Sequence, residues 1–295
     1  MRDCPYGRGR SVFLFFCRLW RINPPMKNVP AVPTRHRYRL TLEYDGTGFS
    51  GWQKQNDART IQGTLLAAAA EIFADDRVDL QGHGRTDAGV HALIYTAHLE
   101  TTGEKMPPAF IVQRFNELLP VGIAVLDIAP CHARFHARHS CLGRSYLYQI
   151  AKRKSAFHKK YVWWVKERLD GAAMAEAAQL FAGMHDFASF AEKQELKKST
   201  LVMLNGLYIS ENAEMLRLRV VGSHFLWRMV RRLAGVLVDV GRGNLAKDEV
   251  AACLAGPSEI PSRLTAPASG LFFEQAFYDE REFADFLAWA AEDAI

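Results

Sequence analysis

The segment Gly82-His-Gly-Arg-Thr-Asp-Ala-Gly-Val-His-Ala92 decides how we interpret this chain. Glycines on both sides let the backbone turn sharply, and small neighbours leave Asp87 exposed in a concavity. Arg85 is close enough to hold a carboxylate or a phosphate. Alternatively, Asp87 caps its own backbone in an Asx-turn. Composition alone leaves both interpretations open.

The segment lies among elements of a mixed α/β fold. Alternation over residues 38–44 predicts a half-buried strand, and an apolar face from Ile61 to Ile72, capped by Thr60, predicts a helix. Further expected elements are strands around 80–83 and 92–99, a helix opened by Pro107 and Pro108, and a strand over 123–128.

The rest of the chain repeats this order loosely. The expected elements are a strand at 145–150, a helix near 172–184, strands at 206–210 and 215–221, a helix from Phe225, a strand over 271–278 and a terminal helix. We therefore expect an α/β (α+β) fold built from two similar βαββα units.

Composition favours a globular chain of about two domains. The sequence has 295 residues, of which 49% are hydrophobic, and this excludes disorder throughout. Residues 1–36 carry seven Lys or Arg, one Asp and five prolines, so we expect a disordered basic extension there. We expect an N-terminal half over 37–142, with the Asp87 loop, and a C-terminal half over 143–295, with a basic helix and the terminal helix.

Cysteine use and hydropathy indicate the compartment. The five cysteines form no Cys-x-x-Cys pair, which argues against a disulfide framework and a cysteine-only zinc site. No stretch approaches the roughly 18 apolar residues of a membrane helix, and arginines break a short run that resembles a signal peptide. We expect a cytoplasmic protein with no membrane association.

Basic and aromatic residues cluster between 131 and 168. This segment has ten Lys or Arg and one acid, Glu167, although the chain after residue 36 carries a net charge of −1. Basic side chains mixed with aromatic ones suit phosphate contact and base stacking. The alternative is a solvated strand edge.

Gly46-Thr-Gly-Phe-Ser-Gly51 matches the Gly-x-Gly-x-x-Gly pattern of dinucleotide-binding proteins in an unsuitable context. That pattern needs a helix that opens across the glycines, whereas the next helix starts near Thr60. We interpret the segment as a glycine-rich turn, or as a mobile loop whose Trp52, Gln53 and Lys54 touch RNA.

His132, His136 and His139 have the spacing of metal ligands on one helical face. No Asp or Glu lies nearby to complete a hydrolytic site, and Arg134 and Arg138 would oppose a divalent cation. Phosphate contact suits the segment better, and we expect no metal.

Gly84-Arg-Thr-Asp-Ala-Gly-Val-His91 resembles the signature of the tRNA pseudouridine synthase A family. The likeness spans residues 38 to about 279 and continues in order through Glu43–Gln55, Phe135–Arg138, Arg144–Tyr148, Asp186–Phe190, Phe225–Arg231 and Thr265–Leu271. Trp227 and Arg228 depart from the family, which often has small polar or imidazole side chains there. This departure puts local RNA contacts in doubt.

The resemblance implies the pseudouridine synthase fold, in which two pseudosymmetric halves form a mostly antiparallel mixed sheet around a basic central cleft. It implies isomerisation of uridine to pseudouridine at positions 38, 39 and 40 of the tRNA anticodon stem-loop, without cofactor or metal, by a homodimer. On the family's motif, Asp87 is the catalytic aspartate, Tyr146 faces the base, and Arg231 pairs with the aspartate. The residues we expect to contact RNA are Trp52, Gln53, Lys54, Arg85, Arg138, Arg144 and Arg228.

Physical chemistry makes the roles of Asp87 and Tyr146 intelligible. Asp87 can attack C1′ as a nucleophile, or take the 2′ proton to give a glycal, and the sequence does not choose between these routes. Tyr146 is suited to stack on the uracil and to help remove the C5 proton.

On a helical wheel from Phe225, Arg231 lies beside apolar residues, whereas Arg228 and Arg232 suit a solvated face. An arginine with apolar neighbours needs a buried anion, and Asp87 is the obvious one.

Two rival functions use the same features. A non-catalytic RNA-binding module or RNA chaperone would use the basic cleft and would not need Asp87. A metal-dependent nuclease would use the three histidines, and a chelator would inactivate it.

Overall fold

A computed structural model of the chain describes residues 35–197 and 199–295. The first half contains β1 (His36–Tyr44), α1 (Ile61–Phe73), β2 (Asp79–Gly82), β3 (His91–Thr101), α2 (Pro108–Leu118) and β4 (Ile123–Pro130). The Thr60 side chain accepts a hydrogen bond from the Gly63 amide and caps α1, and Pro108 stands at the start of α2. Each element predicted for this half is confirmed.

The second half contains more elements than the sequence predicted. It comprises β5 (Gly143–Ala151), β6 (Trp163–Trp164), α3 (Gly171–Ala178), β7 (Gly183–Asp186), β8 (Leu201–Glu211), β9 (Met215–Gly222), α4 (Met229–Gly241), α5 (Lys247–Ala255), α6 (Ile260–Arg263), β10 (Leu271–Phe277) and α7 (Glu280–Glu292). The predictions missed β6, β7, α5 and α6, which are short or weakly periodic.

Two predicted helix bounds are wrong for the same physical reason. The helix expected over 172–184 ends at Ala178, and a single 3₁₀ turn separates it from Gly183, whose φ of +100° no helix contains. The helix expected from Phe225 begins at Met229, because Arg228 has a φ of +61°. In both places a residue with positive φ limits the helix, although the apolar spacing of the sequence continues past that residue.

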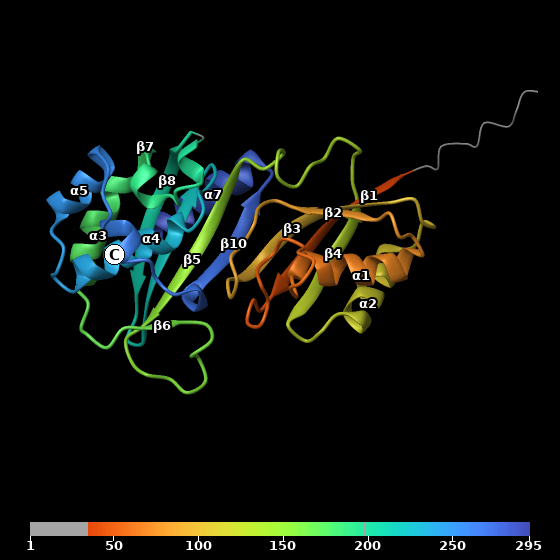
Figure 1. The fold of residues 1–295 in the computed structure, drawn as a ribbon, viewed down its shortest axis with the longest axis horizontal. Coiled ribbons are helices and arrows are strands. Elements are labelled where there is room, and N and C mark those ends of the chain that lie inside the picture. The colour runs from red at the N-terminus through yellow and green to blue at the C-terminus, as the bar shows by residue number, and fades with distance from the viewer. Residues whose placement is uncertain (1–34, 198) are drawn as a thin grey trace, which may run out of the picture. The chain divides into compact units, whose positions relative to one another are not determined.

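The strands form one mixed sheet in the order β4-β1-β3-β10-β5-β9-β8-β7, with β2 beside β3 and β6 beside β5 (Figure 1). The two halves use the same pairing, since β1 lies between β3 and β4 while β5 lies between β9 and β10. These pairs are antiparallel, and the halves meet where β10 runs parallel to β3, with Phe272 opposite His91. The predicted pseudosymmetric, mostly antiparallel mixed sheet is confirmed.

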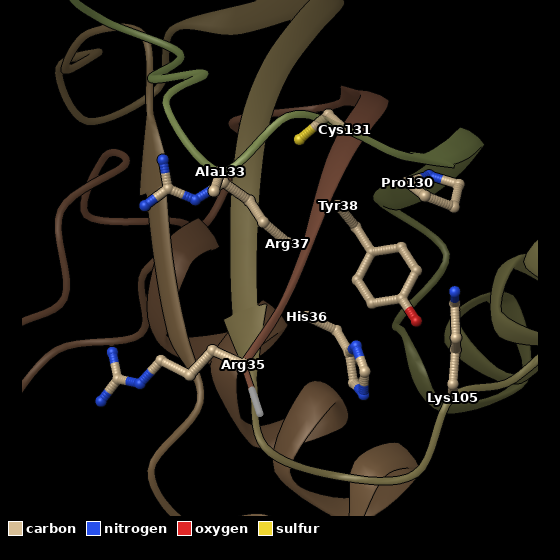
Figure 2. A pocket seen from close by; sticks show the side chains of 8 residues that line it. All are labelled: Arg35, His36, Arg37, Tyr38, Lys105, Pro130, Cys131 and Ala133. Atoms are coloured by element: carbon tan, nitrogen blue, oxygen red, sulfur yellow. The ribbon is translucent and has the colours of Figure 1, made fainter. Parts of the chain in front are cut away.

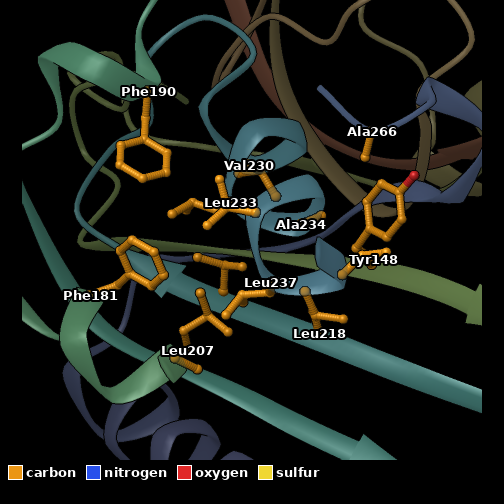
Figure 3. Close-up of a cluster of buried hydrophobic side chains, with 14 of the residues drawn as sticks. Tyr148, Phe181, Phe190, Leu207, Leu218, Val230, Leu233, Ala234, Leu237 and Ala266 are labelled. Carbon is orange, nitrogen blue, oxygen red and sulfur yellow. The ribbon is translucent and has the colours of Figure 1, made fainter. Parts of the chain in front are cut away.

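Each half has its own hydrophobic core. Helices α1 and α2 lie beside the strands of the first half, and α3, α4 and α5 lie beside those of the second (Figure 1). The predicted apolar stripe of α4 is buried, with Val230, Leu233 and Leu237 packed toward Tyr148 and Leu218 (Figure 3). The stripe therefore fixes which side of α4 faces the sheet.

From residue 35 onward, the described part of the chain forms one compact unit. The division between residues 142 and 143 thus stays a prediction, although β5 begins at Gly143. The predicted basic extension lies outside the described residues, except that Arg35 is described and His36 already begins β1. In the part of the chain that the structure describes, no helix combines the length and the apolar character needed to cross a membrane.

Candidate active site

The connection between β2 and β3 carries Asp87 at a tight turn. The amide of Val90 donates to the Asp87 carbonyl (3.2 Å), and Gly89 has a φ of +77°, which favours glycine. Thr86 is buried, and its hydroxyl lies 2.8 Å from that of Tyr44. The Asp87 side chain is 24% exposed, so the turn presents its carboxylate to solvent.

The glycine loop packs directly against this turn. The Trp52 amide donates to the Thr86 carbonyl (3.1 Å). A Cβ on Gly46 would lie 2.0 Å from the Val90 oxygen, and one on Gly51 would lie 2.5 Å from the Thr86 oxygen. These glycines therefore permit a close approach of two backbone segments, and no helix opens across them.

Both oxygens of the Asp87 carboxylate accept hydrogen bonds from the second half of the chain. Arg231 Nη1 lies 3.3 Å from Oδ2 and forms an ion pair with it. Trp227 Nε1 donates to Oδ1 at 2.9 Å. Side chains 140 or more residues away thus hold the carboxylate, in place of the Asx-turn that was the alternative.

A backbone segment after α6 positions Arg231. Its Nε donates to the Ala266 carbonyl (2.7 Å), and the Ala266 amide donates to the Arg231 carbonyl (3.0 Å). A Cβ on Gly235 would lie 1.5 Å from the Leu264 oxygen, so only glycine lets α4 approach this segment. The Arg231 side chain is 17% exposed, and its guanidinium therefore has few orientations other than toward Asp87.

Tyr146 lies on β5 at the border between the two cores. Its ring packs edge-on against Phe225 and Phe273, with centroid distances of 4.9 and 5.2 Å. Burial raises the pKa of Tyr146 above its ordinary value; nearby charges act in opposite directions, Arg144 lowering it and Asp87 raising it. The phenol is therefore protonated at neutral pH and within electrostatic range of Asp87.

Comparison with known proteins identifies the family. The family model described as tRNA pseudouridine synthase matches residues 41–140 and 177–279, which is more than half of the chain. The chain belongs to this family. The matched ranges of the tRNA pseudouridine synthase family contain Asp87, Trp227 and Arg231, whereas Tyr146 lies between them.

Curated relatives in the tRNA pseudouridine synthase family match nearly their whole length. The tRNA pseudouridine synthase A of Rhodospirillum centenum is 40% identical over 82% of this chain and 99% of its own. The tRNA pseudouridine synthase A 2 of Clostridium tetani is 36% identical over 82% of this chain and 98% of its own. The tRNA pseudouridine synthase A of Agrobacterium fabrum is 37% identical over 83% of this chain and 93% of its own.

Several of the side chains that we expect to contact RNA are exposed. Lys54, Arg85 and Arg138 reach solvent. Arg85 Nε donates to Gln53 Oε1 (3.1 Å), and Gln53, which is half-buried, also donates to Gln62 (2.6 Å). The glycine loop therefore supports Arg85 beside the Asp87 turn.

The basic segment after β5 contacts the first residue of β3, four residues after Asp87. His91 Nε2 is 3.0 Å from the Lys160 carbonyl. Lys159 is exposed, and Phe157 is 89% exposed. Cationic and aromatic side chains thus reach solvent near the Asp87 turn, as phosphate contact and base stacking require.

The structure buries two of the side chains that are predicted to contact RNA. Trp52 is 2% exposed and stacks on Tyr95, with ring centroids 4.1 Å apart. Arg144 is 9% exposed and donates to the carbonyls of Ser223, His83 (3.3 Å) and Arg138 (3.0 Å). Both side chains support the fold around the site.

Two other arginines, Arg228 just before α4 and Arg232 within it, differ from each other. Arg228 is 43% exposed and pairs with Glu192 at 3.1 Å, which agrees with a solvated position. Arg232, also predicted on a solvated face, is buried; it donates to the Ala191 carbonyl and pairs with Glu192 at 2.8 Å. Glu192 therefore bridges the two guanidinium groups.

The three predicted histidines do not share a helical face, because residues 131–142 form turns. Of the three, only His136 and His139 have neighbouring rings, with centroids 4.3 Å apart and planes tilted by 51°, while His132 accepts from the Arg134 amide (3.1 Å). Across residues 35–197 and 199–295, no three His, Cys, Asp or Glu side chains are grouped so that they could hold a metal ion.

A cavity of about 200 Å³ is lined by none of the candidate catalytic residues (Figure 2). Its lining consists of Arg35, His36, Arg37, Tyr38, Lys105, Pro130, Cys131 and Ala133. Two of its arginines, Arg35 and Arg37, pair with Glu100. Asp87 does not line this cavity, and the predicted basic cleft around Asp87 stays a prediction.

Sequence reasoning missed Trp227 as a partner of Asp87. A helical wheel places Trp227 beside Arg231, but the wheel assumes a helix that starts at Phe225. The left-handed Arg228 separates Trp227 from α4 and changes its direction. The one available signal was the departure at Trp227 from the family's usual side chains.

Proposed function

We propose that this chain isomerises uridine to pseudouridine at positions 38, 39 and 40 of the tRNA anticodon stem-loop. The observation that carries the proposal is the Asp87 carboxylate, held by Arg231 at 3.3 Å on the turn that bears the family signature. Family membership supports tRNA as the substrate class. The exposed basic and aromatic side chains near the turn support binding of a polyanion.

Asp87 is the proposed catalytic residue, by one of two routes. In the first, a carboxylate oxygen bonds to C1′ while the C1′–N1 bond breaks, and C5 of the rotated uracil then displaces the carboxylate. In the second, Asp87 takes the 2′ proton as N1 leaves and returns it to C2′ when C5 bonds to C1′. In both routes C5 loses a proton and N1 gains one, so the nucleotide keeps its composition.

Tyr146 and Arg231 are proposed to assist. Burial keeps the Tyr146 phenol protonated, so it can relay the C5 proton by accepting it while passing on its own, and its ring can stack on the uracil. Arg231 keeps the carboxylate aimed at the ribose while the target nucleotide leaves its stack, a step that costs a few kcal/mol.

The deciding experiment incubates the chain with unmodified tRNA and analyses the nucleosides. Asp87→Asn and Asp87→Ala should abolish pseudouridine formation and leave tRNA affinity within a few fold, because phosphate contacts supply most of the binding energy. Asp127→Asn, an exposed carboxylate on β4, is the matched control and should keep the parent rate. Near-parent rates for the Asp87 variants would remove Asp87 from catalysis.

The same assay separates the rival functions. An RNA-binding module or chaperone would bind tRNA and form no pseudouridine even as the parent chain. We propose that no metal or cofactor is needed, so EDTA should leave the rate unchanged. Loss of activity with EDTA and its return with zinc would favour a metal-dependent enzyme.

Transcripts with a single uridine at 38, 39 or 40 test the positions, and each should be modified. We further propose, from the family resemblance, that the enzyme acts in the cytoplasm as a homodimer. Light scattering coupled to size-exclusion chromatography should give twice the chain mass, and a mass equal to one chain would contradict the dimer.

A further inference from the structure

Trp227 makes a direct hydrogen bond to the proposed catalytic carboxylate. Its Nε1 donates to Asp87 Oδ1 at 2.9 Å, while Arg231 holds Oδ2 at 3.3 Å. The distance from Trp227 is the shorter of the two, although the indole is neutral. The carboxylate therefore has one donor on each oxygen, and both come from a single five-residue stretch of chain.

The backbone is built to turn Trp227 toward Asp87. Leu226 and Met229 are buried, at 7% and 0% exposure, so both ends of the short segment are anchored in the core. Arg228 between them has a φ of +61°, one of two positive values at non-glycine residues in the part of the chain described here. This left-handed residue leaves Trp227 outside α4, 43% exposed.

A third contact supports the orientation of the indole. The Arg228 guanidinium lies 5.3 Å from the centre of the Trp227 ring and pairs with Glu192 at 3.1 Å. Glu192 is fixed in turn by Arg232 at 2.8 Å. The unfavourable backbone conformation at Arg228 therefore comes with contacts that stabilise the position of Trp227.

An aspartate needs two donors if its carboxylate plane is to be fixed. Rotation of the carboxylate about the Cβ–Cγ bond is only weakly restricted, because this torsion joins an sp³ and an sp² carbon. A single donor, such as Arg231 on Oδ2, lets the plane swing about that contact. A second donor on Oδ1 removes this freedom and leaves a lone pair on each oxygen for the ribose.

We propose that Trp227 is a positioning residue for the isomerisation: its indole N–H fixes the plane of the Asp87 carboxylate against the ribose of the target uridine. The proposal rests on the proposed function of Asp87.

The test compares variants that differ in the donor. Trp227→Phe keeps an aromatic ring and removes the N–H. Trp227→His keeps the N–H, because the imidazole overlays the five-membered ring of indole with Nε2 in place of Nε1. We expect Trp227→Phe to lower the single-turnover rate at saturating tRNA about tenfold, the low end for hydrogen bonds to charged groups, since the indole is half exposed.

The readouts distinguish positioning from a structural or RNA-binding role. Trp227→Phe should keep the tRNA Kd within threefold and the melting temperature within about 2 °C, and Trp227→His should restore the rate to within threefold of the parent. Trp289 is a half-exposed tryptophan on α7 that packs on Arg219, so Trp289→Phe is the matched control and should leave the rate, the tRNA Kd and the melting temperature unchanged. If Trp227→Phe is unstable, Trp227→Met supplies the donor-free variant.

The outcomes separate this proposal from the proposed function. A parent rate for folded Trp227→Phe, or a Trp227→His rate as low as that of Trp227→Phe, would overturn the positioning role while Asp87→Ala stays inactive. A weaker tRNA Kd with an unchanged saturating rate would assign Trp227 to RNA binding instead. Absence of pseudouridine with the parent chain would overturn both proposals.

Discussion

Replacing Gly51 by alanine should displace the Asp87 turn without touching any side chain of the site. Gly51 has a φ of +85°, and a left-handed alanine costs about 1 to 2 kcal/mol by itself. Its new methyl group would lie 2.5 Å from the Thr86 oxygen and 3.1 Å from the Asp87 carbonyl carbon, whereas ordinary contact begins at 3.4 Å. The two backbone segments must therefore separate by about 1 Å, which raises the total loss of unfolding free energy to about 3 kcal/mol.

A shift of about 1 Å in a catalytic group can lower a rate about 100-fold, so we predict a loss of that size for Gly51→Ala. Gly48→Ala is the matched control, because Gly48 has a φ of +77° and a Cβ there would meet nothing within 4 Å. It should lose about 1 to 2 kcal/mol of unfolding free energy and keep the rate within twofold.

Urea unfolding gives the free energies, and single-turnover pseudouridine formation at saturating tRNA gives the rates. Equal rates for the folded Gly51→Ala and Gly48→Ala variants would refute the argument that the glycine loop sets the position of Asp87.

Three further changes test separate parts of the structure. Arg231→Leu breaks a partly buried pair and should slow single turnover about 30- to 100-fold, or about 2 to 3 kcal/mol, with tRNA affinity within threefold; a normal rate would exclude the ion pair from catalysis. Lys159→Ala should weaken tRNA affinity a few fold and leave the rate at saturating tRNA unchanged. The slope of log affinity against log salt should fall by about one, because about one fewer counterion is released on binding. Asp75→Asn should lower the unfolding free energy by about 1 to 2 kcal/mol at pH 7, because the Thr102 and Arg77 amides hold the pKa of Asp75 below its usual range. That contribution is present above about pH 4 and is lost as the pH falls through the folded pKa, so unfolding curves at pH 7 and pH 3 should show the difference shrinking.

The sheet and its repeat were predictable because they depend on period and order. Alternation over 38–44 predicts β1 whatever its neighbours are, since every second side chain must face the core. The apolar stripe from Leu226 to Leu237 likewise predicts the buried side of α4. The pairing of β10 with β3 was not predictable, because a two-residue parallel contact between distant strands leaves no periodic signal.

Whether a single polar or aromatic side chain is buried or exposed was harder to predict. Arg144 and Arg232 are charged like Arg85, yet both are buried, because backbone carbonyls or Glu192 happen to lie within reach. Whether such acceptors exist depends on tertiary packing, which residue type does not reveal. Trp52 was assigned to RNA contact for the same reason, since its stacking partner lies 43 residues away.

The parallel contact between β3 and β10 has a consequence for the newly synthesised chain. β3 starts at His91, four residues after Asp87, and β10 starts at Leu271, five residues after the Ala266 carbonyl that holds Arg231. A nascent chain that has not yet released Leu271–Phe277 from the ribosome can form the Asp87 turn but cannot dock it against Arg231. Competence to act on RNA would then arise only after β10 has been synthesised, so shorter nascent chains carry an unpaired aspartate and no assembled site.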